Sequence, residues 1–362
     1  MKLTLKIKLL PTNKQAQSLV ETIKEANKAC NAISKIAWEN KVFNQFKIHK
    51  LSYYKIKSNF NLSSQVTVRC ISKVTEAYKI DRKVKRVFRE LGGIAYDNRI
   101  LSYKPNDIAS IWSVTGRLKI QFVCHNRRYL PYIKGEADLV YKKGKFFLMQ
   151  TVEIPDEDIE DVEEFIGVDM GLIEIASLSD GTKCNSKTLT DYKIKRQKVR
   201  SSIQSKGTKG AKKLLKRLSG KERTHGTIIN HTISKAIVIK AKSEKKGIAI
   251  EDLKKIRFSA NKKGKRFRSS VGKWSFYQLR QFLSYKAAMA GIPLIVVPPA
   301  YTSKTCSKCF NIGNRNGKQF TCNNCGFMLD ADYNAAKNIG LLGASINTPE
   351  ESTLYCFIAL HR

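Results

Sequence analysis

The sequence predicts a multidomain protein with an α+β first part and an α/β second part, and three observations support this class. An alternating strand near the start is followed by helical sequence and then by a series of short strands. A strongly acidic stretch then divides the chain, and strands alternate with helices beyond it. Because such alternation is typical of layered α/β folds, we expect a small β-barrel with inserted helices, followed by a separate α/β domain.

The chain begins with a strand that leads into helices. Residues 2–10 alternate lysine with apolar residues, which is the period of a half-buried strand. The Pro-Thr-Asn sequence at 11–13 ends this strand and caps a helix expected to reach about Asn40. Ser63 and Ser64 cap further helical sequence, expected to continue to about Leu91 before two glycines interrupt it.

Short strands follow the helices. They are predicted at 94–96, 111–114, 118–123, 137–141 and 146–154, separated by turn residues. A first strand, a helical insertion and five further strands indicate one small barrel with helices inserted into it. We therefore predict a barrel of residues 1–12 and 93–154 and a helical lobe of residues 13–92.

The acidic stretch marks the boundary between the two parts. Residues 153–164 contain eight acidic residues, which could form a metal or partner site. They have no regular ligand spacing, so we interpret residues 155–164 as a solvated linker.

The second part alternates strands with helices. Strands are predicted at 165–168, 173–178, 247–250 and 294–297, with a helix from about Trp274 to Ala290. Residues 193–223 have helical spacing and contain thirteen Lys and Arg residues against one acid, Glu222. This stretch could be a plain solvated helix face, but so few acids exclude the usual ion pairs within a helix. An external polyanion explains it better.

The charge of the whole chain points to the same partner. There are 67 Lys and Arg residues against 30 Asp and Glu residues, a formal net charge of +37. Such a surplus repels itself unless a polyanion neutralises it, and nucleic acid is the commonest one. A hydrophobic content of 42% argues against a disordered basic tail.

The sequence also predicts a cytoplasmic, nucleoid-associated protein with no membrane partner. The start reads as a strand and not as a signal peptide, and no run of about 18 apolar residues could span a bilayer. Five cysteines stand singly among apolar neighbours, as expected of buried thiols in a reducing compartment. They are Cys30, Cys70, Cys124, Cys184 and Cys356.

Three carboxylates in the second part are candidates for catalysis. Asp169 and Glu251 each end an apolar strand, and Asp332 opens a helical segment. Each alone could be a turn former or a helix cap, but together they fit an RNase-H-like sheet. Converging carboxylates can hold two divalent cations, magnesium by default, for attack on a phosphodiester. Asp330 competes with Asp332, which we prefer because it directly precedes the Asn-Ala-Ala segment.

Four cysteines have the spacing of a zinc site. Cys306 and Cys309 form one Cys-x-x-Cys pair, and Cys322 and Cys325 form a second one twelve residues later. Two such pairs complete a closed, tetrahedral, structural zinc site. A redox pair is the alternative, but it has no need of a second copy.

One helix face is a candidate nucleic-acid contact. Gln65, Arg69 and Lys73 are four residues apart and share a face that could read base edges; ordinary helix surface is an equal alternative. His231 could reach the active site or a phosphate, although a packed, hydrogen-bonded histidine is the favoured interpretation.

These motifs resemble the TnpB proteins of bacterial and archaeal insertion sequences. The resemblance covers nearly the whole chain, and its last motif is the most specific. The motifs are Val168-Asp169-Met170-Gly171, Ile250-Glu251-Asp252-Leu253, Tyr301-Thr302-Ser303-Lys304-Thr305-Cys306-Ser307-Lys308-Cys309 and Asp332-Tyr333-Asn334-Ala335-Ala336-Lys337-Asn338-Ile339. The Leu9–Gln15 and Trp274–Ala287 segments are similar too.

The resemblance implies an RNA-guided DNA endonuclease, a compact relative of type V CRISPR effectors. Its guide RNA would derive from the transposon end, and its double-stranded DNA target would carry a transposon-adjacent motif. The family's RuvC triad falls on Asp169, Glu251 and Asp332. Phe310, where a glycine is usual, is the clearest departure and bears on the ribbon's geometry.

The implied architecture is a wedge barrel with an inserted recognition lobe, then a RuvC nuclease domain holding a zinc ribbon. The RuvC domain would comprise residues 165–302 and 327–343, the ribbon residues 303–326, and a C-terminal tail residues 344–362. Two alternatives stay open: a guided or unguided DNA-binding protein that does not cut, and a transposition accessory or strand-transfer protein.

Overall fold

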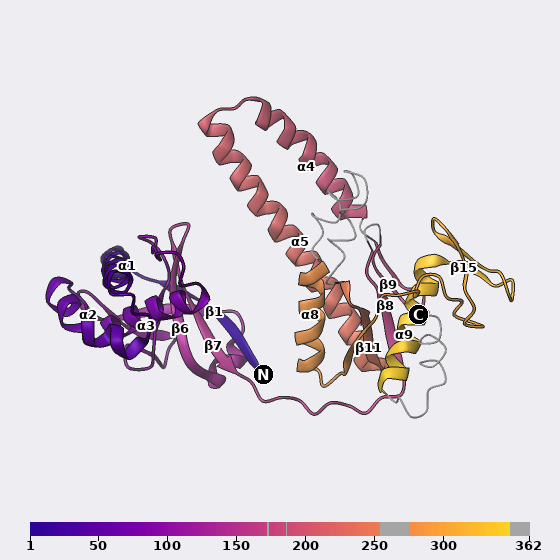
Figure 1. Ribbon diagram of the computed structural model, residues 1–362, viewed down its shortest axis with the longest axis horizontal. Helices are drawn as coiled ribbons and strands as arrows, with labels where there is room; N and C mark the ends of the chain where they lie inside the picture. Colours follow the sequence, from indigo (N-terminus) through magenta and orange to yellow (C-terminus); the bar gives the residue numbers. More distant parts are fainter. Residues whose placement is uncertain (172–173, 186, 254–275, 348–362) are drawn as a thin grey trace. The chain divides into compact units, whose positions relative to one another are not determined.

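The computed structural model describes residues 1–171, 174–185, 187–253 and 276–347 (Figure 1). The chain divides into two compact units, Met1–Pro155 and Asp156–Arg362. The predicted helix start at Trp274 and most of the predicted tail lie outside the described residues. None of the helices in the described ranges is long and apolar enough to cross a membrane.

Unit 1 contains a seven-stranded antiparallel sheet in the order β2-β6-β7-β1-β5-β4-β3. On the edge strand β2, the Tyr96 hydroxyl donates to the Trp112 carbonyl of β4 at 2.9 Å. Strand β4 lies next to the opposite edge of the sheet, so this bond connects the two ends of the strand order. The sheet therefore curls towards a closed barrel, as predicted. Its strands are β1 (Lys2–Leu10), β2 (Ile94–Tyr96), β3 (Leu101–Lys104), β4 (Ile108–Ser113), β5 (Gly116–Cys124), β6 (Ile133–Lys142) and β7 (Lys145–Glu153); β3 was not predicted.

Three helices lie between β1 and β2. Thr12 and Gln15 cap the first reciprocally, and the Ser63 hydroxyl caps the third, as the sequence predicts. Their apolar faces pack with the inner face of the sheet in one core. The helices are α1 (Asn13–Glu39), α2 (Gln45–Asn59) and α3 (Ser64–Ile80).

The predicted continuation of helix to Leu91 is wrong, because α3 ends at Ile80. Polar side chains of α1 bind the backbone of the following segment instead. Asn31 accepts from the Phe88 N–H at 2.7 Å and donates to the Phe88 carbonyl at 2.9 Å, and Ser34 donates to the Arg86 carbonyl at 2.6 Å. These bonds satisfy the segment's backbone groups without a helix.

Unit 2 is built on a five-stranded sheet in the order β10-β9-β8-β11-β12. Strands β8, β11 and β12 are parallel, whereas β9 and β10 are antiparallel to their neighbours. This mixed sheet confirms the α/β prediction. The strands are β8 (Phe165–Asp169), β9 (Glu174–Leu178), β10 (Lys183–Asn185), β11 (Gly247–Glu251) and β12 (Leu294–Val297).

Helices cover both faces of this sheet (Figure 1). Even-numbered residues of β8 and β11, such as Val168 and Ile250, pack with α5 (Lys209–Glu244) and α8 (Phe276–Met289). Odd-numbered residues, such as Phe165 and Ala249, pack with α9 (Ala331–Asn347). Because side chains alternate along a strand, Asp169 and Glu251 belong to the α9 face.

A helical hairpin carries the basic stretch. The predicted helical sequence at 193–223 is two helices, α4 (Lys187–Ser205) and α5, because the chain turns at Gly207 with a φ of +63°. The Thr208 hydroxyl then caps α5 by accepting from the Ala211 N–H at 3.1 Å.

Between β12 and α9 the chain forms a small three-stranded antiparallel sheet, which the sequence did not predict. Its strands are β13 (Gly313–Asn316), β14 (Gln319–Cys322) and β15 (Met328–Asp330).

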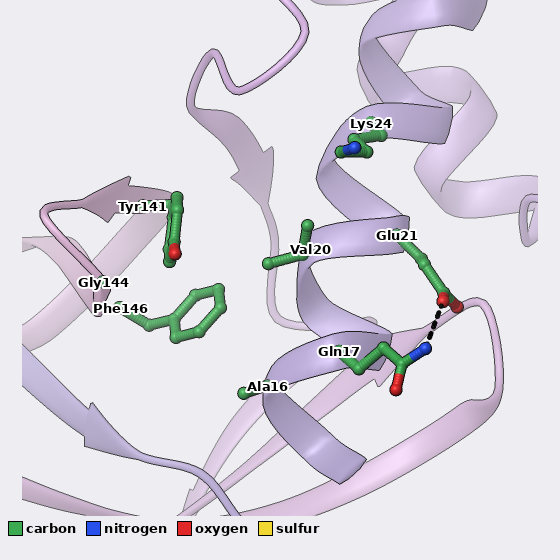
Figure 2. Close-up of a pocket in the computed structure, with 8 residues that line it drawn as sticks. All are labelled: Ala16, Gln17, Val20, Glu21, Lys24, Tyr141, Gly144 and Phe146. Atoms are coloured by element: carbon green, nitrogen blue, oxygen red, sulfur yellow. Dashed lines mark hydrogen bonds between the residues drawn. The ribbon is translucent and has the colours of Figure 1, made fainter. Parts of the chain in front are cut away.

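Unit 1 also contains an open cavity of about 380 Å³ between α1 and the β6–β7 turn. Tyr141 and Phe146 face Ala16 and Val20 across it (Figure 2). On its rim Gln17 donates to Glu21 at 3.2 Å. Apolar walls and internally paired polar groups mark it as a packing gap, and no predicted site residue lines it.

Candidate functional site

Asp169 and Glu251 lie at the carboxyl ends of neighbouring parallel strands. Val168 pairs with Ile250 in the β8–β11 ladder, so each acid is the next residue along its strand. Equivalent positions on neighbouring parallel strands point to the same face. The sheet therefore places the two carboxylates side by side on the α9 face.

Helix α9 brings Asp332 to the same place through a very close contact with β8. A Cβ added to Gly167 would lie 1.9 Å from the Ala336 carbonyl oxygen, and one added to Gly340 would lie 2.7 Å from the Phe165 oxygen. Ala336 is one helical turn after Asp332, and Gly167 is two residues before Asp169. The glycines thus fix the start of α9 beside the end of β8.

Two of the three carboxylates, Asp169 and Glu251, have raised pKa values. Burial, and then the charges of Glu251 and Asp332, raise the pKa of Asp169 to about 7. Burial also raises the pKa of Glu251, which is 8% exposed, although Thr302 and Arg315 act in the opposite direction. Buried acids of like charge favour a cation beside them. This cluster therefore suits hard divalent ions, which prefer oxygen ligands.

Arg315 is a site residue that the sequence did not reveal. It lies on β13, and its guanidinium donates to Asp332 at 2.8 Å. Its charge also opposes the raised pKa values of Asp169 and Glu251. No spacing marks this arginine in the sequence, because only the β13–β14 hairpin carries it to the carboxylates.

Asp330 has a different role from Asp332. Its Oδ1 accepts from the backbone N–H groups of Asp332 and Tyr333, each at 3.1 Å, so it caps α9. Its Oδ2 accepts from Lys183 at 2.7 Å. The choice of Asp332 for the triad stays a prediction, and this geometry favours it.

The four ribbon cysteines gather at one point. Their sulfur atoms all lie within 4.8 Å of one another, with Cys306 and Cys325 at 3.8 Å and Cys309 and Cys322 at 3.5 Å. In the part of the chain that the structure describes, no other His, Cys, Asp or Glu group of three or more is as tight. The carboxylate cluster is accordingly more open.

The cysteine cluster fits a zinc ion. Backbone N–H groups of Lys308 and Cys325 point at Cys306 and Cys322, at 3.4 and 3.5 Å. The backbone N–H of Asn311 is the main cause that lowers the pKa of Cys309 to about 6. Four thiolates in two such turns form a closed tetrahedral donor set. The unusual Phe310 has a φ of +62°, matching +67° at Gly326 in the second turn.

The predicted nucleic-acid face of α3 is turned towards its own unit. Gln65 contacts Asp97 and accepts from Arg99 at 3.1 Å, and Arg69 pairs with Glu136. Lys73 donates to Asn27 at 2.7 Å and to the Gly93 carbonyl at 2.8 Å. Their part in nucleic-acid binding stays a prediction, and these contacts weigh against it, most of all for Lys73.

Helix α2 offers an exposed surface that the sequence analysis missed. Phe46 and Tyr54 are 86% and 81% exposed, and Lys50 lies between them at four-residue spacing. A groove of about 580 Å³ beside Phe46 is lined by Lys41, Lys47, Lys79 and Arg82 and by no acid. The chain has no acidic residue between Glu39 and Glu76, which was the available signal.

The α4–α5 hairpin is the second basic surface. Ten cationic residues within its residues 195–223 are exposed, and Arg200 is paired with Glu222 at 3.2 Å. The exposed cations are Lys195, Lys198, Lys206, Lys209, Lys212, Lys213, Lys216, Arg217, Lys221 and Arg223. His231 is exposed, but its ring stacks on that of Phe282 with the ring centroids 3.8 Å apart, which favours the packed interpretation.

Known proteins resemble this chain in sequence and in fold. Residues 276–339 match the family model described as Cas12f1-like, TNB domain. The chain is similar in fold to a chain of the solved Cas12f1-sgRNA-target DNA complex, with a TM-score of 0.63, 15% identity, and coverage of 91% of this chain and 83% of the other.

Two curated relatives are similar in sequence. The putative RNA-guided DNA endonuclease InsQ of Escherichia coli (strain K12) is 28% identical over 246 residues, which cover 61% of this chain and 60% of InsQ. The TnpB-like protein MJ0751 of Methanocaldococcus jannaschii is 32% identical over 188 residues, which cover 48% of this chain and 67% of that protein. The sequence resemblance is thereby confirmed, and the chain belongs to the TnpB-like family.

Proposed function

We propose that this protein is an RNA-guided DNA endonuclease encoded by an insertion sequence. The observation that carries the proposal is the placement of Asp169 and Glu251 at adjacent carboxyl ends of parallel strands, with Asp332 opening the helix that packs on the same face. The strand order, with the first strand of the unit central and the next two antiparallel beside it, supports an RNase-H-like RuvC domain.

The carboxylates would hold divalent cations, with magnesium as the natural choice. Asp169 and Asp332 would bind directly, and Glu251 would complete the shell of one ion. When bound, the ions activate water and stabilise the leaving oxygen of the phosphodiester. Arg315 would offset the charge of Asp332 or of the substrate phosphate, because its guanidinium already lies within hydrogen-bonding distance of that carboxylate.

The proposed nucleic-acid partners are a guide RNA from the transposon end and a double-stranded DNA target. The net charge of +37, the exposed cations of the α4–α5 hairpin and the aromatic surface of α2 support them. Base pairing with the RNA would read the target, and the protein would read only a short flanking motif. The four cysteines would bind one structural zinc.

The test compares cutting with binding. Purified protein with a defined guide receives matched and scrambled duplexes, both carrying candidate flanking sequences, with and without magnesium. We expect cleavage of the matched duplex alone, only with magnesium, and a loss of several orders of magnitude in Asp169→Ala and Asp332→Ala.

The two variants should still bind the matched duplex within a few-fold of wild type, because neither residue contributes to the basic surfaces. Guided binding without any cutting by wild type would favour the alternative of a non-cutting DNA-binding protein. Equal cutting of both duplexes would rule out guidance.

A further inference from the structure

A buried hydroxyl contacts the middle carboxylate of the proposed triad. Thr302 Oγ1 donates to Glu251 Oε1 at 2.5 Å, and the two residues are 5% and 8% exposed. Within the described ranges, Glu251 Oε2 accepts no hydrogen bond from the protein. One carboxylate oxygen is therefore held while the other is left for a different ligand.

Thr302 is itself fixed by α9. Asn338, 4% exposed, donates to the Thr302 carbonyl at 2.8 Å and to the Thr305 carbonyl at 2.7 Å. Asn334, fully buried one turn earlier, also donates to the Thr305 carbonyl, at 2.7 Å. Because α9 begins with the turn that carries Asp332, one network links the orientation of Glu251 to the helix that presents Asp332.

We propose that Thr302 is a positioning residue that aims Glu251 at the divalent cation. This inference rests on the proposed function, since it assumes that Glu251 is a metal ligand. A fixed hydrogen bond restricts the carboxylate to one orientation, so less rotational freedom is lost when the ion binds. Partners of this kind, which hold a ligand without touching the metal, change metal affinity about 10–100-fold when they are removed.

A purely structural role for Thr302 makes different predictions. Its hydroxyl also lies 3.4 Å from the Pro299 carbonyl, so it could simply shape the turn after β12. In that case its loss would lower thermal stability without a selective effect on the metal. Metal affinity, measured under conditions in which both proteins are fully folded, therefore separates the two roles.

The experiment uses the full chain in complex with its guide RNA. Thr302→Val removes the hydroxyl at constant shape, and Thr302→Ser restores it. Thr305→Val is the matched control, because Thr305 is equally buried at 5% and its hydroxyl bonds to nothing in the described part of the chain. Mn²⁺ binding, followed by the paramagnetic resonance of free Mn²⁺, and cleavage against Mg²⁺ concentration are the readouts.

We expect Thr302→Val to weaken the site's Mn²⁺ affinity about ten-fold or more. The Mg²⁺ concentration for half-maximal cleavage should rise in parallel, and saturating metal should recover most of the rate. Thr302→Ser and Thr305→Val should match wild type. Wild-type metal affinity in Thr302→Val, or no recovery in Thr302→Ser, would overturn the inference.

Two additional variants keep the outcome decisive. If Thr302→Val does not fold, Thr302→Ala compared with Thr302→Ser applies the same criterion. Glu251→Ala tests the assumption beneath the inference: unchanged Mn²⁺ binding and cleavage in that variant would refute the proposed function. Loss in Glu251→Ala with no effect of Thr302→Val would refute only the role of Thr302.

Discussion

Asp169 shows how the site's chemistry opposes the stability of the fold. Its pKa is raised to about 7, first by burial and then by its acidic neighbours. A raised acid pKa means that the folded state disfavours the charged form. The loss of folding free energy caused by ionising Asp169 is absent below its unfolded pKa of about 4. It grows as the pH rises and is complete above about pH 7.

Asp169→Asn should therefore stabilise the protein when no divalent cation is added. We expect the melting temperature to rise by several degrees at pH 8, by less at pH 6, and to approach wild type towards pH 4. Thermal unfolding across this pH range, without a chelator that would remove zinc, measures the effect. An equal shift at all three pH values would contradict the electrostatic explanation.

Phe310 is the second residue whose conformation lowers stability, because it has a left-handed backbone. A left-handed backbone costs a non-glycine residue about 1–2 kcal/mol, and Phe310 adopts it in the first metal-binding turn. Phe310→Gly should strengthen zinc retention several-fold, because glycine adopts this backbone conformation without that cost. Gly326→Ala, where a Cβ meets nothing within 4 Å, should weaken retention by backbone strain alone. Competition with a coloured chelator measures both; a weaker hold on zinc in Phe310→Gly would contradict this prediction.

At the scale of elements, the packing of α9 on β8 decides where Asp332 lies. Gly167→Ala places a methyl group 1.9 Å from the Ala336 oxygen, so the helix must move away or the unit must unfold. We expect loss of cleavage and destabilisation of about 3 kcal/mol or more, as for severe overpacking. Gly220→Ala on α5, where nothing lies within 4 Å, should be neutral or stabilising. Urea unfolding and cleavage measure both, and an active, stable Gly167→Ala would contradict the argument.

Local sequence signals predicted the positions of helices and strands better than the contacts between segments distant in sequence. Thr12, Ser63 and the apolar periods gave the starts of α1 and α3 and the strands β8, β11 and β12. The end of α3 could not be predicted, because Asn31 and Ser34 of another helix hold the segment after it. The cysteine cluster follows from spacing alone, whereas Arg315 and Thr302 reach the carboxylates only through the path of the folded chain.

At the scale of the whole molecule, two surfaces should bind nucleic acid by different interactions: α5 by charge and α2 by base stacking. Replacing Lys212, Lys213 and Lys216 on α5 with glutamine should weaken binding and make it less sensitive to salt, by about one released counterion for each phosphate that these lysines neutralise. Phe46→Ala and Tyr54→Ala on α2 should cost about 1–3 kcal/mol for each stacked base and leave the salt slope unchanged. RNA affinity at several salt concentrations separates them; a changed slope in the aromatic variants would contradict stacking.

The path of the chain through unit 2 also orders its biosynthesis. Strand β8 emerges from the ribosome early, but α9, which covers it and carries Asp332, emerges only after the three-stranded sheet of the ribbon. Contacts between segments so distant in sequence form slowly. Until then the face of β8 that carries Gly167 lacks the helix that covers it, and we expect partly made chains to expose apolar surface there. The same order of synthesis keeps Asp332 apart from Asp169 and Glu251 until the ribbon has been made, so the three carboxylates can come together only in the nearly complete unit.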